Sequence, residues 1–111
     1  MSRRTRTRLE DIAVACAAIA RYVARADADD EIVFDAIRIR LIEIGEAVKD
    51  LEPEVLTAEP DIPWQEITRM RDLLAHRYFD TAHAIVLTTA RTDIPTLAAA
   101  NARILAALGE E

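Results

Sequence analysis

The chain has 111 residues, of which 51% are hydrophobic, and a formal net charge of −6. This length allows one domain with a single core, and no apolar run approaches the roughly 20 residues that a membrane-spanning helix needs. The acidic balance argues against a general nucleic-acid binder, so an RNA-binding protein of this charge would have to concentrate its positive charge locally.

The N-terminal segment is strongly basic, with four arginines among its first eight residues. We predict that residues 1–8 form a disordered, solvated arm, because charged termini are seldom held by a core. An arm that contacts RNA is the alternative. No long apolar segment with a cleavage site follows these arginines, so we expect no signal peptide and a cytoplasmic protein.

An all-α fold is predicted, because the chain contains only two glycines and long stretches rich in Ala, Leu, Ile, Glu and Arg. We expect a single domain over residues 1–111, built as an up-and-down bundle of four to five helices. The first helix should span residues 7–26, because its apolar residues recur at steps of three and four. These residues are Leu9, Ile12, Cys16, Ile19 and Val23.

The second helix should span residues 31–51, with Ile39 and Ile42 beside its main apolar stripe. A helix that is apolar on more than one side has to be covered on more than one side, which favours a homodimer. Gly45 costs about 1 kcal/mol in mid-helix relative to alanine, so we expect it to allow close approach of a neighbouring helix. The main stripe consists of Phe34, Ile37, Leu41, Ile44, Val48 and Leu51.

The second half of the chain should form the remaining helices. Residues 51–61 form the main connection, with room for one helical turn, and Pro63 suits the first turn of the third helix. Trp64 should anchor that corner in the core, and His83 should be a surface or capping residue. The fourth helix should begin after Asp80 or Thr81, and Pro95 should start or kink the last helix.

The sequence RDLLAHRYFD, residues 71–80, combines side chains suited to phosphate chemistry. Arg71 can fork onto a phosphate, His76 can move a proton near neutral pH, and Tyr78 offers a hydroxyl. Arg71 and His76 lie about 140° apart on an ideal helix. They can meet one phosphate only if the helix bends or ends there, or if two chains pool their motifs. The alternative is an ordinary solvated pair of Asp72 and His76.

A metal site is not predicted. The chain offers two histidines and one cysteine, and Cys16 falls on the apolar stripe of the first predicted helix. These residues make no convincing ligand set, so we expect no metal and no other cofactor.

The spacing of arginine, four residues, histidine, one residue and tyrosine resembles the HepT-like branch of the HEPN superfamily. Three further segments are similar to that family: residues 36–51, with an Ile-Gly-Glu-Ala core, residues 61–76, with an Ile-Pro-Trp opening, and residues 92–97. The resemblance covers roughly residues 30–100 in the expected order.

The resemblance implies a HEPN-like homodimer in which two motifs face one cleft. It implies the toxin of a type VII-like HEPN/MNT toxin–antitoxin system, a metal-independent endoribonuclease that leaves a 2′,3′-cyclic phosphate. Arg71 would hold the phosphate, His76 would transfer the proton, and Asp72 would orient His76 or stabilise its imidazolium form. Arg69 and Arg77 would contribute positive charge for RNA.

The same resemblance implies a partner, a minimal nucleotidyltransferase antitoxin that silences the toxin by transferring AMP to Tyr78. A second hypothesis is a non-catalytic helical dimer that binds and regulates this nucleotidyltransferase. A third, a plain structural bundle, explains the core but leaves the motif as a coincidence.

Overall fold

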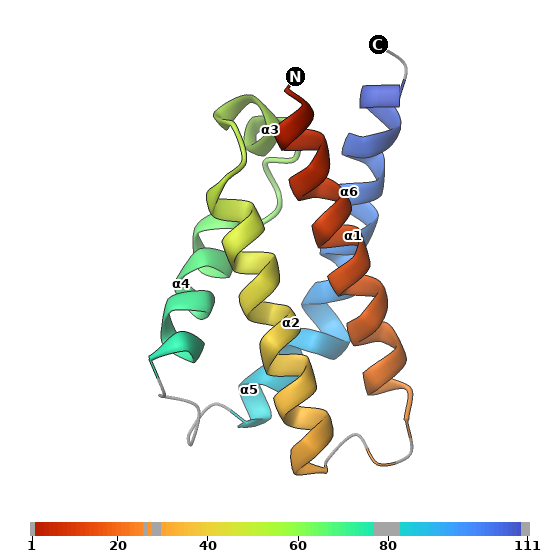
Figure 1. Ribbon diagram of the computed structural model, residues 1–111, viewed down its shortest axis with the longest axis vertical. Coiled ribbons are helices and arrows are strands. Elements are labelled where there is room, and N and C mark those ends of the chain that lie inside the picture. Colours follow the sequence, from red (N-terminus) through yellow and green to blue (C-terminus); the bar gives the residue numbers. More distant parts are fainter. Residues whose placement is uncertain (1, 26, 28–29, 77–82, 110–111) are drawn as a thin grey trace.

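The computed structural model describes residues 2–25, 27, 30–76 and 83–109 (Figure 1). These residues contain helices and no strand, which confirms the all-α prediction. A π-helical turn, Thr89–Asp93, joins the last two helices. The helices are α1 (Arg3–Val23), α2 (Glu31–Lys49), α3 (Pro53–Ala58), α4 (Trp64–Ala75), α5 (His83–Thr88) and α6 (Ile94–Gly109).

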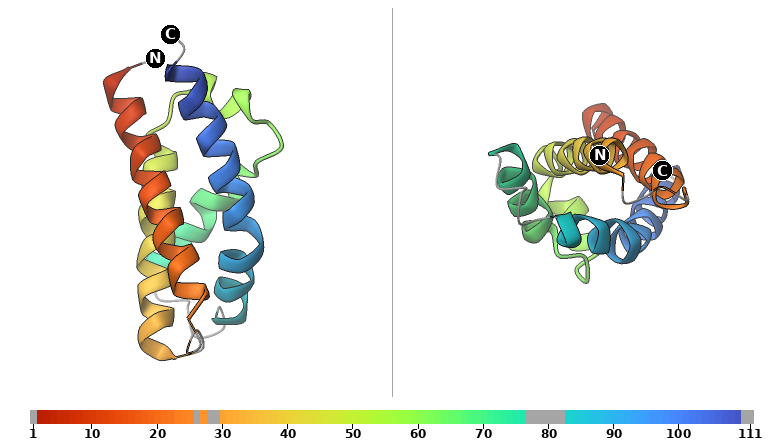
Figure 2. Two further views of the ribbon diagram at one scale, coloured as in Figure 1. Left: turned by 90° about the vertical axis from the view of Figure 1, so that its right-hand side faces the viewer. Right: turned by 90° about the horizontal axis from the view of Figure 1, so that it is seen from below.

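Helix α2 is the central element of the bundle (Figure 1). It packs against α1 on one side and against α4 on another, while α6 packs against α1 (Figure 2). The predicted apolar stripe of α2 is buried from Phe34 to Val48, as expected for a helix with neighbours on two sides. Of its additional apolar residues, Ile42 is partly buried against the core, whereas Ile39 remains 49% exposed. None of the described helices is both long and apolar enough to cross a membrane.

The N-terminal segment differs from the prediction of a disordered arm over residues 1–8. Helix α1 begins at Arg3, and the Ser2 side chain caps it by accepting a hydrogen bond from the backbone N–H of Thr5. The Thr5 hydroxyl is buried and donates to Glu52 at 2.6 Å, while Arg4 forks onto Asp50 at 2.8 Å. The prediction was wrong because these partners lie more than 40 positions away in the sequence and approach only in the folded chain.

Two aromatic rings outside the motif have defined packing roles. Trp64 is buried, as predicted, and its indole N–H lies 3.1 Å from the backbone oxygens of both Leu56 and Glu59. His83 was expected to be a surface or capping residue, but its ring stacks on Phe34 with centroids 4.2 Å apart. This stacking attaches the start of α5 to α2, a contact that sequence spacing does not reveal.

The C-terminal helices meet at the π-helical turn. Pro95 is the second residue of α6, close to the predicted start of the last helix. The described part of the fourth predicted helix begins at His83, and the expected caps Asp80 and Thr81 lie outside the described residues. The turn buries Ala90 and leads directly into the buried Ile94 of α6.

Gly45 of α2 faces Arg71 and Ile67 of α4 at close range. A Cβ atom on Gly45 would overlap the Cβ of Arg71, and would lie 2.7 Å from Arg71 Cγ and 3.4 Å from the backbone oxygen of Ile67. Contacts this short do not occur between real side chains, so only glycine fits without movement of α4. The expected close approach of a neighbouring helix is therefore confirmed, and that helix is α4.

We predict that Gly45→Ala lowers the free energy of unfolding by about 1–3 kcal/mol, because the overlap outweighs the roughly 1 kcal/mol that alanine gains in a helix interior. Gly109→Ala is the matched control, since no atom lies within 4 Å of a Cβ at that position. Urea denaturation of both variants and the wild type measures the difference. Equal or higher stability of Gly45→Ala would show that α4 shifts at no cost.

Candidate functional site

The predicted catalytic residues lie at the C-terminal end of α4. Arg71 and Asp72 belong to the last two turns of this helix, and His76 is the residue that caps it. The two other residues of interest, Arg77 and Tyr78, lie outside the described residues. The site is therefore described from Arg71 to His76 and from the face of α2 against which α4 packs.

Arg71 is held between carboxylates of two helices. Its Nε forms an ion pair with Glu46 of α2, and its Nη1 donates to Asp72 Oδ1 at 2.9 Å. The side chain is only 25% exposed. The hydrogen bond to Asp72, together with the negative charge of Glu46, raises the pKa of Arg71, so the guanidinium stays charged.

The carboxylate of Asp72 binds cations and does not contact the imidazole of His76. Its Oδ1 accepts a hydrogen bond from Lys49 Nζ at 2.9 Å as well as the one from Arg71. The Lys49 hydrogen bond, followed by that of Arg71, lowers the pKa of Asp72 below its ordinary value. The carboxylate is therefore ionised at neutral pH and lies between two positive charges.

His76 is oriented by the backbone of Asp72. Its Nδ1 lies 2.6 Å from the Asp72 carbonyl oxygen. A carbonyl oxygen only accepts hydrogen bonds, so Nδ1 carries the proton and Nε2 of the neutral ring is left available for proton transfer. The contact between Asp72 and His76 thus runs through the main-chain carbonyl oxygen of Asp72.

Helix α4 ends within the motif, which is one of the conditions under which Arg71 and His76 could meet one phosphate. Arg71 and His76 lie too far apart around a continuous helix to share a phosphate, but the helix ends at His76. The described contacts connect the two residues through Asp72, whose carboxylate binds Arg71 and whose carbonyl oxygen binds His76. Arg69 stands apart from this group, because its exposed side chain pairs with Glu66 at 2.6 Å.

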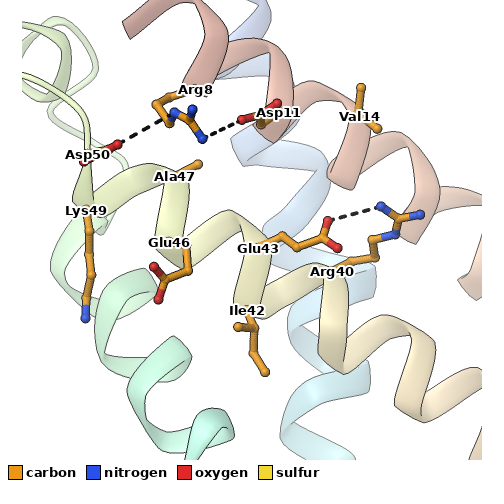
Figure 3. A pocket seen from close by; sticks show the side chains of 10 residues that line it. All are labelled: Arg8, Asp11, Val14, Arg40, Ile42, Glu43, Glu46, Ala47, Lys49 and Asp50. Carbon is orange, nitrogen blue, oxygen red and sulfur yellow. Dashed lines mark hydrogen bonds and ion pairs between the residues drawn. The ribbon is translucent and has the colours of Figure 1, made fainter. Parts of the chain in front are cut away.

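Two residues of the site, Glu46 and Lys49, were missed by reasoning from the motif alone. Both come from α2 and line a hollow of about 630 Å³ on the α1–α2 face (Figure 3). Figure 3 shows both side chains directed toward α4. The only sequence signal was the Ile-Gly-Glu-Ala core, in which Glu46 directly follows Gly45.

Metal ligands are not gathered in the described part of the chain, where no three residues among His, Cys, Asp and Glu are placed to hold an ion. Cys16 is buried in α1, and this burial raises its pKa to about 11. A thiol in this environment stays protonated and behaves as a small apolar side chain.

Comparison with known proteins identifies the family. The family model described as "Ribonuclease HepT-like" matches residues 10–104. A "Probable ribonuclease HepT" from Thermococcus cleftensis is 36% identical over 101 residues, which are 87% of this chain and 92% of that protein. A "Putative RNase" from Caldanaerobacter subterraneus is 43% identical over 60 residues, 53% of this chain and 54% of that protein.

A second "Putative RNase", from Methanocaldococcus jannaschii, is 42% identical over 60 residues, 53% of this chain and 52% of its own length. No solved structure matches the chain. The family model covers most of the chain, including the two helices that build the site and the whole segment from Arg71 to His76. The chain therefore belongs to the HepT-like ribonuclease family.

Proposed function

We propose that this chain is an endoribonuclease, the toxin of a type VII-like HEPN/MNT toxin–antitoxin system. The main support for this proposal is the arrangement of side chains at the end of α4. There a charged arginine and an exposed histidine are joined through Asp72. Membership of the HepT-like family supports RNA as the substrate, because relatives of this chain are named as ribonucleases.

The proposed reaction uses the ribose 2′-hydroxyl as nucleophile. The 2′-oxygen attacks the phosphorus, the bond to the 5′-oxygen breaks, and a 2′,3′-cyclic phosphate forms. His76 Nε2 takes the 2′-hydroxyl proton or, when protonated, delivers one to the departing 5′-oxygen. Arg71 stabilises the charge on the phosphate oxygens. Because Glu46 and Asp72 contact Nε and Nη1, we assign the N–H groups of Nη2 to the phosphate.

This reaction assigns no step to a metal ion or another cofactor. The support is the chemistry of the available side chains, since the described residues gather no set of metal ligands. A positively charged guanidinium can provide the electrostatic stabilisation that a metal ion provides in other nucleases.

A homodimer is part of the proposal. Apolar side chains remain exposed on the helices that carry the site, including Ile39 of α2 at 49% and Leu73 of α4 at 43%. Burial of such residues against a second copy is favourable, and it would bring a second Arg71 and His76 near the first. Two motifs would then supply one histidine as base and another as acid.

We expect light scattering to give about twice the chain mass of 12.4 kDa at micromolar concentration. Leu73 is the exposed apolar residue nearest to His76 in the sequence. Replacing it with a charged side chain in Leu73→Lys should shift the protein toward the monomer and reduce cleavage in parallel. A wild-type chain that is monomeric and still cleaves RNA would rule out the shared cleft.

Cleavage of RNA by the purified protein should persist in EDTA and should fall about 10²–10⁴-fold in His76→Ala, the range typical of a lost proton-transfer group. Arg71→Ala should be similarly impaired, and Arg71→Lys should recover little because a point charge cannot replace the planar fork. Arg103→Ala is the control, since Arg103 of α6 pairs with Glu59 and neither residue belongs to α2 or α4. Loss of activity with chelator, or full activity of His76→Ala, would contradict the mechanism.

The antitoxin partner is proposed to be a minimal nucleotidyltransferase that modifies Tyr78. The tyrosine oxygen would attack the α-phosphorus of ATP, pyrophosphate would leave, and a base on the partner would accept the phenolic proton. Tyr78 lies two positions after His76 in the sequence. In this proposal, an attached AMP would add a phosphodiester close to Arg71. That charge would compete with RNA for Arg71.

After incubation with the partner, ATP and magnesium, intact mass spectrometry should show added AMP on the wild type and none on Tyr78→Phe. Tyr78→Phe should keep its ribonuclease activity, because the hydroxyl has no role in the proposed cleavage. An unchanged wild-type mass combined with neutralised toxicity would point instead to control by binding alone.

A non-catalytic regulator of the nucleotidyltransferase remains the second candidate. The net charge of −6 and the two carboxylates beside Arg71 favour it, because both weaken the attraction of RNA phosphates. Growth after induction without the partner separates the candidates. A toxin arrests growth and its His76→Ala variant does not, whereas a regulator behaves alike with or without His76.

A further inference from the structure

We propose that Glu46 is a positioning residue for cleavage, one that holds the Nε side of the Arg71 guanidinium so that Nη2 faces the RNA phosphate. The proposal rests on the proposed function, in which Arg71 binds that phosphate. Glu46 touches no reacting atom in this scheme and acts only through the arginine.

The root of the Arg71 side chain is already fixed by the packing of the two helices. The Cβ and Cγ of Arg71 lie against the backbone of α2 at Gly45. The side chain of any residue other than glycine at position 45 would occupy the same space. The guanidinium at the far end has no such constraint, because the intervening bonds of a long side chain rotate freely. Glu46, the next residue along α2, is placed to hold this far end through Nε.

The charges across the α2–α4 contact alternate in sign. Glu46 of α2 pairs with Arg71 of α4, and Arg71 pairs with its neighbour Asp72. Asp72 in turn pairs with Lys49, which lies on α2 one turn after Glu46. Each cation therefore has a carboxylate partner on the opposite helix. Without Glu46, the guanidinium would be drawn by Asp72 alone and would rotate toward Oδ1, where Lys49 already binds.

Exposure argues against a purely stabilising role for this ion pair. The Glu46 side chain is 52% exposed, and ion pairs that reach solvent in this way contribute little to stability. Precise placement of a group that stabilises a transition state has a much larger effect, since an error of about 1 Å can cost about 10²-fold in rate. The consequence of removing Glu46 should therefore appear in kcat and not in the melting temperature.

The test compares Glu46→Ala and Glu46→Gln with the wild type, using kcat and KM for RNA cleavage and thermal unfolding. We expect Glu46→Ala to lower kcat about 10–100-fold with a nearly unchanged KM and melting temperature. Glu46→Gln should recover little of the loss, because its neutral amide cannot form the ion pair with the guanidinium. Glu43→Ala is the matched control, since Glu43 lies one turn earlier on α2 and pairs with Arg40 at 3.1 Å.

A readout independent of activity is the ¹⁵N resonance of the Arg71 Nε–H group, assigned by its disappearance in Arg71→Lys. Its exchange with water should accelerate in Glu46→Ala and stay slow in Glu43→Ala. Wild-type kcat in Glu46→Ala while Arg71→Ala is inactive would overturn this inference and leave the proposed function intact. An increased kcat would also overturn it, by showing that Glu46 restrains the arginine unproductively. Wild-type cleavage by Arg71→Ala would instead overturn the proposed function.

Discussion

The close contact between α2 and α4 at Gly45 is the constraint on which the site depends. Because Gly45 has no side chain, the first carbons of Arg71 lie directly against the backbone of α2. This approach brings Glu46 and Lys49 of α2 within reach of Arg71 and Asp72 of α4. The glycine weakens the helix locally, and the favourable consequence is a charged cluster built from two elements.

The charge of the cluster shows how an acidic chain can hold a charged arginine near its surface, as the proposed role of Arg71 in binding phosphate requires. The overall charge is −6, yet carboxylates around Arg71 hold the guanidinium in place and raise its pKa. In the proposed function the same carboxylates would compete with RNA, so affinity at this site would depend on geometry more than on net charge. A second copy of the chain, as proposed, would double the local positive charge without changing the sequence.

The two ends of the site are controlled by different forces. Arg71 is placed by an ion pair that crosses to Glu46 of α2 and by Asp72 of its own helix, whereas His76 is placed by a backbone carbonyl at the end of α4. The histidine therefore keeps its orientation independently of α2, while the arginine depends on it. Changes in α2 packing would alter the ion pair of Arg71 before they alter the contact between His76 and the Asp72 carbonyl oxygen.

The pattern of apolar residues along the chain was sufficient to predict the helices and most of their buried faces, because helical periodicity is a local property. The long helices, the buried Trp64 and the close approach at Gly45 were all anticipated in this way. The candidate site from Arg71 to His76 could also be identified from the sequence, since its motif consists of residue types at a fixed spacing along one segment.

Only the tertiary structure decided which side chains meet across helices. The N-terminal residues were expected to be disordered, but Thr5 is held by Glu52, and the ring of His83 stacks on Phe34. Glu46 and Lys49 joined the site for the same reason, because partners more than 20 positions apart have no common spacing in the sequence. Even Asp72, correctly placed beside His76, binds it through a backbone oxygen that no side-chain pattern encodes.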